Sequence, residues 1–170
     1  KMKDIIRFVA DPVPATSDTA QNSGVQEGYG FEWEARWRPT RDWDIRGHWT
    51  WQHSVDKTGG GKRDAAYAPE QELYIQANWR FKPRWNGNVQ ANHVMNRKRE
   101  EGDPRPPIKD YITVDLTIRA QELVRHWTFA ASVRNLFDAD AREPSLNGTL
   151  LPRDLPLAGR SVYLEVGYQF

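Results

Sequence analysis

The stretch that decides the fold is residues 31–37, which read Phe-Glu-Trp-Glu-Ala-Arg-Trp. Its odd-numbered positions are aromatic or aliphatic, and its even-numbered positions are charged. Side chains of a β-strand point alternately to opposite faces, so this pattern predicts a strand with one apolar and one polar face. Helical periodicity is nearly absent elsewhere, and the sequence predicts an all-β chain.

The same period of two returns on both sides of this stretch. The clearest repeats are residues 43–52, 71–81, 110–119 and 162–170, and weaker ones are residues 85–95, 127–135 and an opening strand at residues 2–9. Most are close to the ~9–11 residues that a tilted strand needs to cross a bilayer. The sequence therefore predicts about eight strands.

The predicted connections alternate in length. The short ones are residues 39–42, 82–84 and roughly 120–126, and the long ones are roughly residues 10–28, 53–70, 96–109 and 136–160. Short turns at one end and long loops at the other are typical of an antiparallel, up-and-down transmembrane β-barrel. In such a barrel the short turns face the periplasm.

Aromatic residues gather beside the short turns, which separates a membrane barrel from a soluble β-sandwich. A sandwich core would place its large rings nearer the strand centres, whereas amphipathic rings favour the membrane–water boundary. The residues concerned are Trp37, Trp43, Phe81, Trp85, Trp127, Tyr168 and Phe170.

Composition excludes several other classes of protein. The chain has 24 Lys and Arg against 23 Asp and Glu, so it lacks the basic excess of a nucleic-acid binder. Its mean hydropathy of −0.81 and the lack of a long apolar run exclude a transmembrane helix. A barrel strand remains compatible with low hydropathy, because only alternate side chains meet lipid. Without cysteine there is neither a disulfide nor a thiolate metal site.

Three motifs near the end resemble the C-terminus of the TonB-dependent outer-membrane receptors. Residues 133–138 (Val-Arg-Asn-Leu-Phe-Asp) resemble the segment that closes the penultimate strand in that family. Gly159-Arg160 before residues 162–164 resembles the approach to the final strand, and the chain ends Tyr168-Gln169-Phe170. Residues 68–70 and 111–116 also fit, and the resemblance covers roughly residues 28–170.

The resemblance implies a barrel of about twenty-two strands, plugged by a separate N-terminal domain. Residues 1–170 would then be the C-terminal part of the barrel, without the plug domain. Such receptors import a scarce nutrient, most often a ferric siderophore, with energy from the TonB complex. That complex would act only through the missing N-terminal part. Tyr168 and Phe170 would form the signal for the barrel-assembly machinery.

Cationic residues in two predicted long loops are the candidate ligand-binding residues. Arg97, Lys98 and Arg99 lie in one loop, and Arg142 and Arg153 lie in the other. Clustered cations can attract an anionic ferric chelate or the phosphates of lipopolysaccharide. The plain alternative is a solvated loop.

Catalytic and metal sites are not expected. His48 and His53 are an odd number of residues apart, so on one strand they would lie on opposite faces. Glu32 and Glu34 share a face with Arg36, which indicates an ion-paired lumen wall. The sequence contains no recognisable nucleophile–base set, so we expect neither an enzyme nor a cofactor.

Two other functions remain open from the sequence. The first is a complete eight-stranded outer-membrane protein with a structural or adhesive role, which predicts a signal peptide just before Lys1. The second is a soluble β-barrel that binds a small ligand, which predicts that the chain is folded and monodisperse without detergent. An enzyme is the least supported class.

Overall fold

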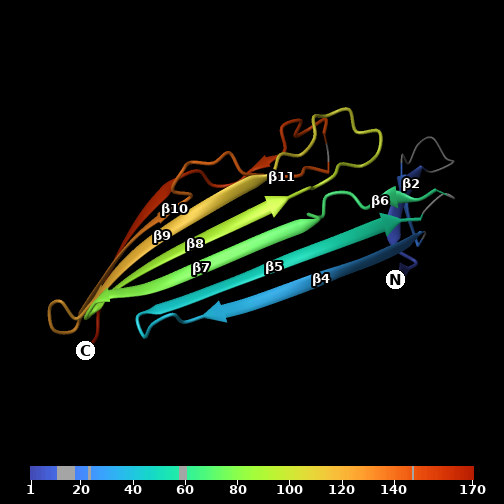
Figure 1. Ribbon diagram of the computed structural model, residues 1–170. Coiled ribbons are helices and arrows are strands. Elements are labelled where there is room, and N and C mark those ends of the chain that lie inside the picture. Colours follow the sequence, from blue (N-terminus) through green and yellow to red (C-terminus); the bar gives the residue numbers. More distant parts are fainter. Residues whose placement is uncertain (11–17, 23, 58–60, 147) are drawn as a thin grey trace.

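The computed structural model describes residues 1–10, 18–22, 24–57, 61–146 and 148–170. One antiparallel sheet dominates it, and neighbouring strands of the sheet follow one another along the chain (Figure 1). Its long strands are β4 (Val25–Trp37), β5 (Trp43–Asp56), β7 (Gln71–Lys82), β8 (Trp85–Met95), β9 (Tyr111–Gln121), β10 (Trp127–Arg134) and β13 (Ser161–Tyr168). This up-and-down order confirms the predicted fold class.

Short strands complete the architecture. β1 (Met2–Lys3) pairs with β4 at one edge of the sheet, and β13 forms the other edge. The remaining short strands are β2 (Ile6–Ala10), β3 (Asp18–Asn22), β6 (Arg63–Asp64), β11 (Arg142–Glu143) and β12 (Leu155–Pro156). The sheet is thus an open segment of barrel wall. Nowhere in the described ranges is there a helix long and apolar enough to span a membrane.

The two ends of the sheet differ as predicted. Figure 1 shows the short turns and the C-terminus at one end and the long connections at the other. We call these the short-turn end and the long-loop end. The predicted long connections at residues 10–28 and 53–70 include residues 11–17, 23 and 58–60, which lie outside the described residues.

Strand register places the apolar side chains of neighbouring strands on one continuous face. Trp33 pairs with Trp49, and Trp49 pairs in turn with Leu73. At the far edge of the sheet, Ala131 of β10 pairs with Leu164 of β13, and Leu164 is 80% exposed. A face this apolar and this exposed is the surface that a barrel presents to lipid. The last strand therefore turns Val162, Leu164 and Val166 outward, as the sequence predicts.

The opposite face is polar and internally hydrogen-bonded. The Asn88 side-chain amide donates to Asn78 Oδ1 (2.8 Å), and Gln90 Nε2 donates to Asn88 Oδ1 (2.8 Å). The Tyr74 hydroxyl donates to Gln90 Oε1 (3.2 Å). These bonds run across β7 and β8 and satisfy polar groups on the face that a closed barrel turns to its lumen.

The predicted single opening strand at residues 2–9 is wrong. The chain forms two strands there, β1 in the main sheet and β2 paired with β3 in a separate sheet. Asp4 stands between them with φ of 57°. Left-handed backbone, which aspartate tolerates better than most residues, redirects the chain and ends the first strand.

Strand β4 begins at Val25, six residues before the stretch that revealed it. Gly28 and Gly30 interrupt the alternation of apolar and polar residues, and Glu27 occupies an odd-numbered position. Glu27 pairs with Lys1 (2.8 Å) and with Lys57. Ion pairing satisfies that carboxylate, so backbone pairing with β5 extends beyond the apolar pattern.

Burial is concentrated at the long-loop end. The sheet is a single layer, and no large side chain among the described residues is fully buried. Most of the buried residues belong to the long-loop end or to the strand ends beside it: Val55, Val94, Arg97, Ile108, Asn135, Ala141 and Ser145. The long loops therefore pack against one another.

Candidate functional site: the ion-pair network of the long loops

Two loops build the network that contains most of the candidate ligand-binding residues. The β8–β9 loop comprises residues 96–110, and the β10–β13 loop comprises residues 135–160. Asn96 leaves β8 with φ of 56°, and its backbone N–H donates to Asp110 Oδ1 (2.8 Å). This contact turns the chain out of the sheet and directs the following arginines toward the β10–β13 loop.

Arg97 is buried between the two loops, with 5% of its surface exposed. Its Nη1 donates to Glu143 Oε2 (2.8 Å), and its Nη2 donates to the carbonyl of Arg142 (2.7 Å). Its guanidinium carbon lies 5.1 Å from the centre of the Tyr111 ring. A guanidinium that is buried, paired and stacked in this way holds the loops together.

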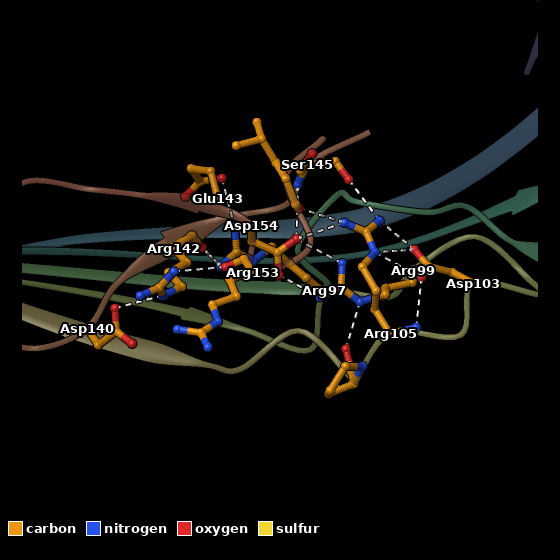
Figure 2. A network of polar contacts seen from close by, with 12 residues as sticks. Arg97, Arg99, Asp103, Arg105, Asp140, Arg142, Glu143, Ser145, Arg153 and Asp154 are labelled. Atoms are coloured by element: carbon orange, nitrogen blue, oxygen red, sulfur yellow. Dashed lines mark hydrogen bonds and ion pairs between the residues drawn. The ribbon is translucent and has the colours of Figure 1, made fainter. Parts of the chain in front are cut away.

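Asp154 is the second centre of the network (Figure 2). Arg99 donates to both of its carboxylate oxygens, at 2.9 and 2.5 Å, and the N–H of Ser145 donates to Oδ1 at 3.1 Å. Arg105 approaches the same carboxylate at 3.4 Å. It also donates to Asp103 at 2.5 Å and to the carbonyl of Ser145 at 2.9 Å.

These contacts keep the two carboxylates ionised. The hydrogen bond from Arg99 lowers the pKa of Asp154 below its ordinary value. Hydrogen bonds from Arg105 lower the pKa of Asp103 to about 2. Pairing with a guanidinium favours the charged carboxylate more than partial burial disfavours it. The network is therefore intact at neutral pH.

Lys98 lies on a separate branch that reaches the β5–β7 loop (residues 57–70). Its ammonium group donates to Asp64 Oδ2 (2.6 Å) and to Glu70 Oε1 (3.0 Å). The carbonyl of Lys98 accepts a hydrogen bond from the N–H of Tyr67 (2.7 Å). The hydrogen bond with Asp64 raises the pKa of Lys98, so this lysine stays charged.

Arg142 and Arg153 belong to the β10–β13 loop. The Arg142 guanidinium donates to Asp140 Oδ1 (2.8 Å) and to the carbonyl of Arg153 (2.9 Å). Arg142 is the first residue of β11, which pairs with β12, and Arg153 lies two residues before β12. The Arg142 side chain is 35% exposed, so it is far more accessible than Arg97 or Arg99.

The structure thus brings Arg97, Arg99, Arg142 and Arg153 to the two packed loops and places Lys98 beside them. Sequence reasoning missed the side chains that pair with them, which are Asp64, Glu70, Asp140, Glu143 and Asp154. It also missed the adjoining pair of Asp103 and Arg105. The spacing of Asp103 and Arg105 could have indicated a local pair. The pairing of Arg99 with Asp154, 55 residues apart, has no local signal.

The motif at residues 133–138 closes the base of the β10–β13 loop. Asn135, 5% exposed, donates from Nδ2 to the carbonyls of Ala139 (2.9 Å) and Ala158 (3.3 Å). The Asp138 carboxylate accepts a hydrogen bond from the N–H of Arg160 (2.8 Å). Asparagine and aspartate therefore join the two ends of the loop, which brings residues 133–138 beside Gly159-Arg160.

The aromatic residues at the end of the chain lie at the short-turn end. Tyr168 is in β13, where its ring centre lies 5.1 Å from that of Trp127 and 5.1 Å from that of Phe170. Phe170 is fully exposed. The position matches the predicted aromatic belt, and the role of both residues in assembly stays a prediction.

An exposed apolar face, a polar face, short turns and long packed loops together define a segment of outer-membrane β-barrel. The family model "TonB dependent receptor-like, beta-barrel" matches residues 1–136, so this chain belongs to that family. It is a family of transport receptors of the Gram-negative outer membrane, which places this chain in that membrane.

Solved structures agree on the fold. The ferric-catecholate import receptor Fiu from K12 E. coli has a TM-score of 0.73 at 20% identity, over 99% of this chain and 24% of its own. FpvA of P. aeruginosa, bound to a ferric pyoverdine, has a TM-score of 0.72 at 18% identity, over 99% and 23%. The copper transporter OprC has a TM-score of 0.72 at 17% identity, over 99% and 27%.

The chain therefore spans about a quarter of the length of these structures. Among curated proteins, none matches this chain in sequence.

Proposed function

We propose that this chain is the C-terminal part of the barrel of a receptor that takes up a scarce nutrient with energy from TonB, and that the nutrient is a ferric siderophore. Membership of the TonB-dependent receptor family is the observation that carries the proposal. It favours a receptor over a structural barrel, a soluble ligand-binding barrel or an enzyme. The plug domain and the TonB contact would belong to other parts of the full-length protein.

The nature of the nutrient rests on similar structures and on the charge of the long loops. Two of the structures named above carry ferric chelates in their descriptions, and the third transports copper. The accessible cations at the long-loop end suit an anionic chelate. The same cations would contact lipopolysaccharide phosphates at the outer surface.

Uptake by cells that express the full-length protein tests this proposal. We expect radiolabelled iron to accumulate from a ferric siderophore when the receptor and TonB are both present. Haem, cobalamin and a copper chelate serve as alternative nutrients. Accumulation of copper or cobalamin, but not of ferric siderophores, would overturn the iron assignment. Iron uptake that continues without TonB would overturn the energy source.

Substitutions in the loops test the candidate binding residues. Arg142→Ala and Arg153→Ala remove accessible cations, so each should weaken chelate binding about 2–5-fold, the value of a solvent-exposed ion pair. Binding of the ferric chelate to the purified receptor is measured by fluorescence quenching. Arg97→Ala is a poor test, because it also breaks the buried contacts between the loops. Unchanged binding in both variants would remove Arg142 and Arg153 from the site.

A further inference from the structure

Lysines gather around one carboxylate at the long-loop end of β4. Lys1 Nζ lies 2.8 Å from Glu27 Oε1, and Lys57 Nζ donates to the other oxygen of the same carboxylate. These three residues and Lys62 line a hollow of about 320 Å³. The N-terminus lies beside the start of β4 (Figure 1), so residues far apart in the chain meet here. We call Lys1, Lys57 and Lys62 the outer lysine cluster.

Strand register places the outer lysine cluster on the face that meets lipid. β4 and β5 pair position by position from Gln26 to Trp37, so Glu27 points to the same side as Tyr29. The Tyr29 ring centre lies 5.7 Å from that of Trp51, which belongs to the apolar face. The backbone N–H of Lys57 donates to the carbonyl of Val25 and continues this pairing by one step. The lysines therefore stand on the outer side of the wall and not in the lumen.

The cluster lies just beyond the aromatic residue that ends the apolar band of β4. Trp37 and Tyr29 are eight positions apart on this face, and both rings are exposed. At ~3.4 Å per residue and a tilt of ~40°, they are separated by ~21 Å along the membrane normal, close to the ~25 Å apolar band of a membrane barrel. Glu27 lies two positions past Tyr29, which is roughly 5 Å further out by the same geometry. The lysines thus reach the level of the lipid head groups on the extracellular side.

The outer lysine cluster carries more positive charge than its carboxylate neutralises. Two of its lysines share the single negative charge of Glu27, and Lys62 adds a third ammonium group. The carboxylates of Asp64 and Glu70 contact Lys98 instead. The two lysines that pair with Glu27 are 55% and 42% exposed. Because an ammonium group has three N–H donors, each can also donate to a second anion.

We propose that the outer lysine cluster binds a phosphate group of lipopolysaccharide in the outer leaflet. A phosphomonoester carries nearly two negative charges and three acceptor oxygens, so it complements three ammonium groups better than one carboxylate does. The acyl chains of the same molecule lie on the exposed rings of Phe31 and Trp33, further along this face. Lysine suits this level, because its methylene stem contacts apolar surface while its charge stays among head groups. The proposal rests on the place of the chain in the outer membrane and not on the nutrient.

Native mass spectrometry of the purified full-length protein tests this proposal. The probe is lipid A with both of its phosphates, titrated in detergent, so that each bound molecule adds a known mass. Replacing all three lysines should weaken binding at least ~10-fold, because each lysine beside an anionic lipid contributes a factor of ~5. The changes are Lys1→Gln, Lys57→Gln and Lys62→Gln. Resistance of the unheated barrel to SDS verifies that the variant folds.

A matched variant and other phosphate sources complete the test. Lys82→Gln, Lys109→Gln and Arg125→Gln remove the same charge elsewhere and should leave lipid A binding unchanged. Lipid A without phosphates should bind the unaltered protein at least ~10-fold more weakly, by the same factor per lysine. Equal binding to both triple variants would overturn the proposal. So would phosphatidylglycerol that binds as tightly as lipid A, or inorganic phosphate that displaces lipid A, since the cluster would then recognise any anionic lipid or a soluble anion.

Discussion

The long-loop end and the short-turn end of this sheet both carry many arginines, but they use them differently. At the long-loop end, Arg97, Arg99 and Arg105 side chains are at most 10% exposed, and each lies within 3 Å of a carboxylate. At the short-turn end, Arg38 and Arg80 remain more than half exposed. Burial of the ion pair, and not the number of arginines, separates a structural cation from one that can bind a partner.

This difference changes how arginines in the loops are interpreted. Arg97, Lys98 and Arg99 form an obvious cationic run in the sequence, but each of them contacts an acidic side chain from another loop. At the short-turn end, Arg36, Arg46 and Arg80 alternate with apolar residues along strands and look like ordinary wall residues in the sequence. Strand pairing places them together.

The largest effect is expected from deleting Phe170 at the short-turn end. Phe170 is fully exposed and contacts the Tyr168 ring edge-on, so its loss should leave the packing of the sheet nearly unchanged. If Phe170 belongs to the predicted assembly signal, we expect most of the receptor to be absent from the outer membrane. Immunoblotting of outer-membrane fractions measures this, with Gln169→Ala as the control. Normal levels would show that Phe170 is only a membrane-facing ring.

The second largest effect is expected from placing a charge on the apolar face of the sheet, between its two ends. Leu164→Arg places a charge in lipid and should destabilise the barrel by ~2–4 kcal/mol if residue 164 lies near the bilayer midplane. Glu165→Arg, one residue further on the polar face, is the matched control and should cost much less. Urea titration of the full-length protein in lipid vesicles measures both. Equal effects would contradict the assignment of the two faces.

Breaking the centre of the long-loop network should have an intermediate effect. Asp154→Asn removes the charge that receives Arg99 and Arg105, and loss of charged hydrogen bonds costs about 1.5–3 kcal/mol. Faster hydrogen exchange in residues 96–110 and 143–155 would report it. Asp140→Asn, whose side chain is 71% exposed, should change exchange by less than ~1 kcal/mol. Similar exchange in both variants would show that burial does not strengthen the Asp154 pairs.

The smallest effect is expected from lowering the pH, which should weaken the ion pairs of Asp103 and Asp154 in the long-loop network without any change at neutral pH. The pKa values of Asp103 and Asp154 are lowered, that of Asp103 to about 2, so their stabilising pairs exist above the unfolded-state pKa of about 3.9. That stability should be lost progressively as the pH falls from about 4 toward 2. The chain has no cysteine, so spin labels at Glu101→Cys and Leu146→Cys can report the separation of the loops. Loops that separate already at pH 6 would contradict this pKa assignment.

Much of the architecture could be predicted from local patterns. Residues 31–37 reveal β4, and the alternation of short and long connections reveals the two ends of the barrel. The predicted strand boundaries were wrong where the alternation of apolar and polar residues stopped. Asp4 divides the opening strand through its backbone conformation, and Gly28 and Gly30 hide the first part of β4. Backbone pairing continues through such positions because hydrogen bonds between strands do not require apolar side chains.

The sequence by itself determined the strands, their apolar and polar faces, the resemblance to the receptor family and the cationic character of the long loops. These features follow from a period of two and from short motifs, both of which are local. The tertiary structure alone decided which charges meet. Arg99 reaches Asp154 across 55 residues, and Arg36, Arg38 and Arg46 converge on Asp44, because strand register and loop packing bring distant carboxylates and guanidinium groups into contact.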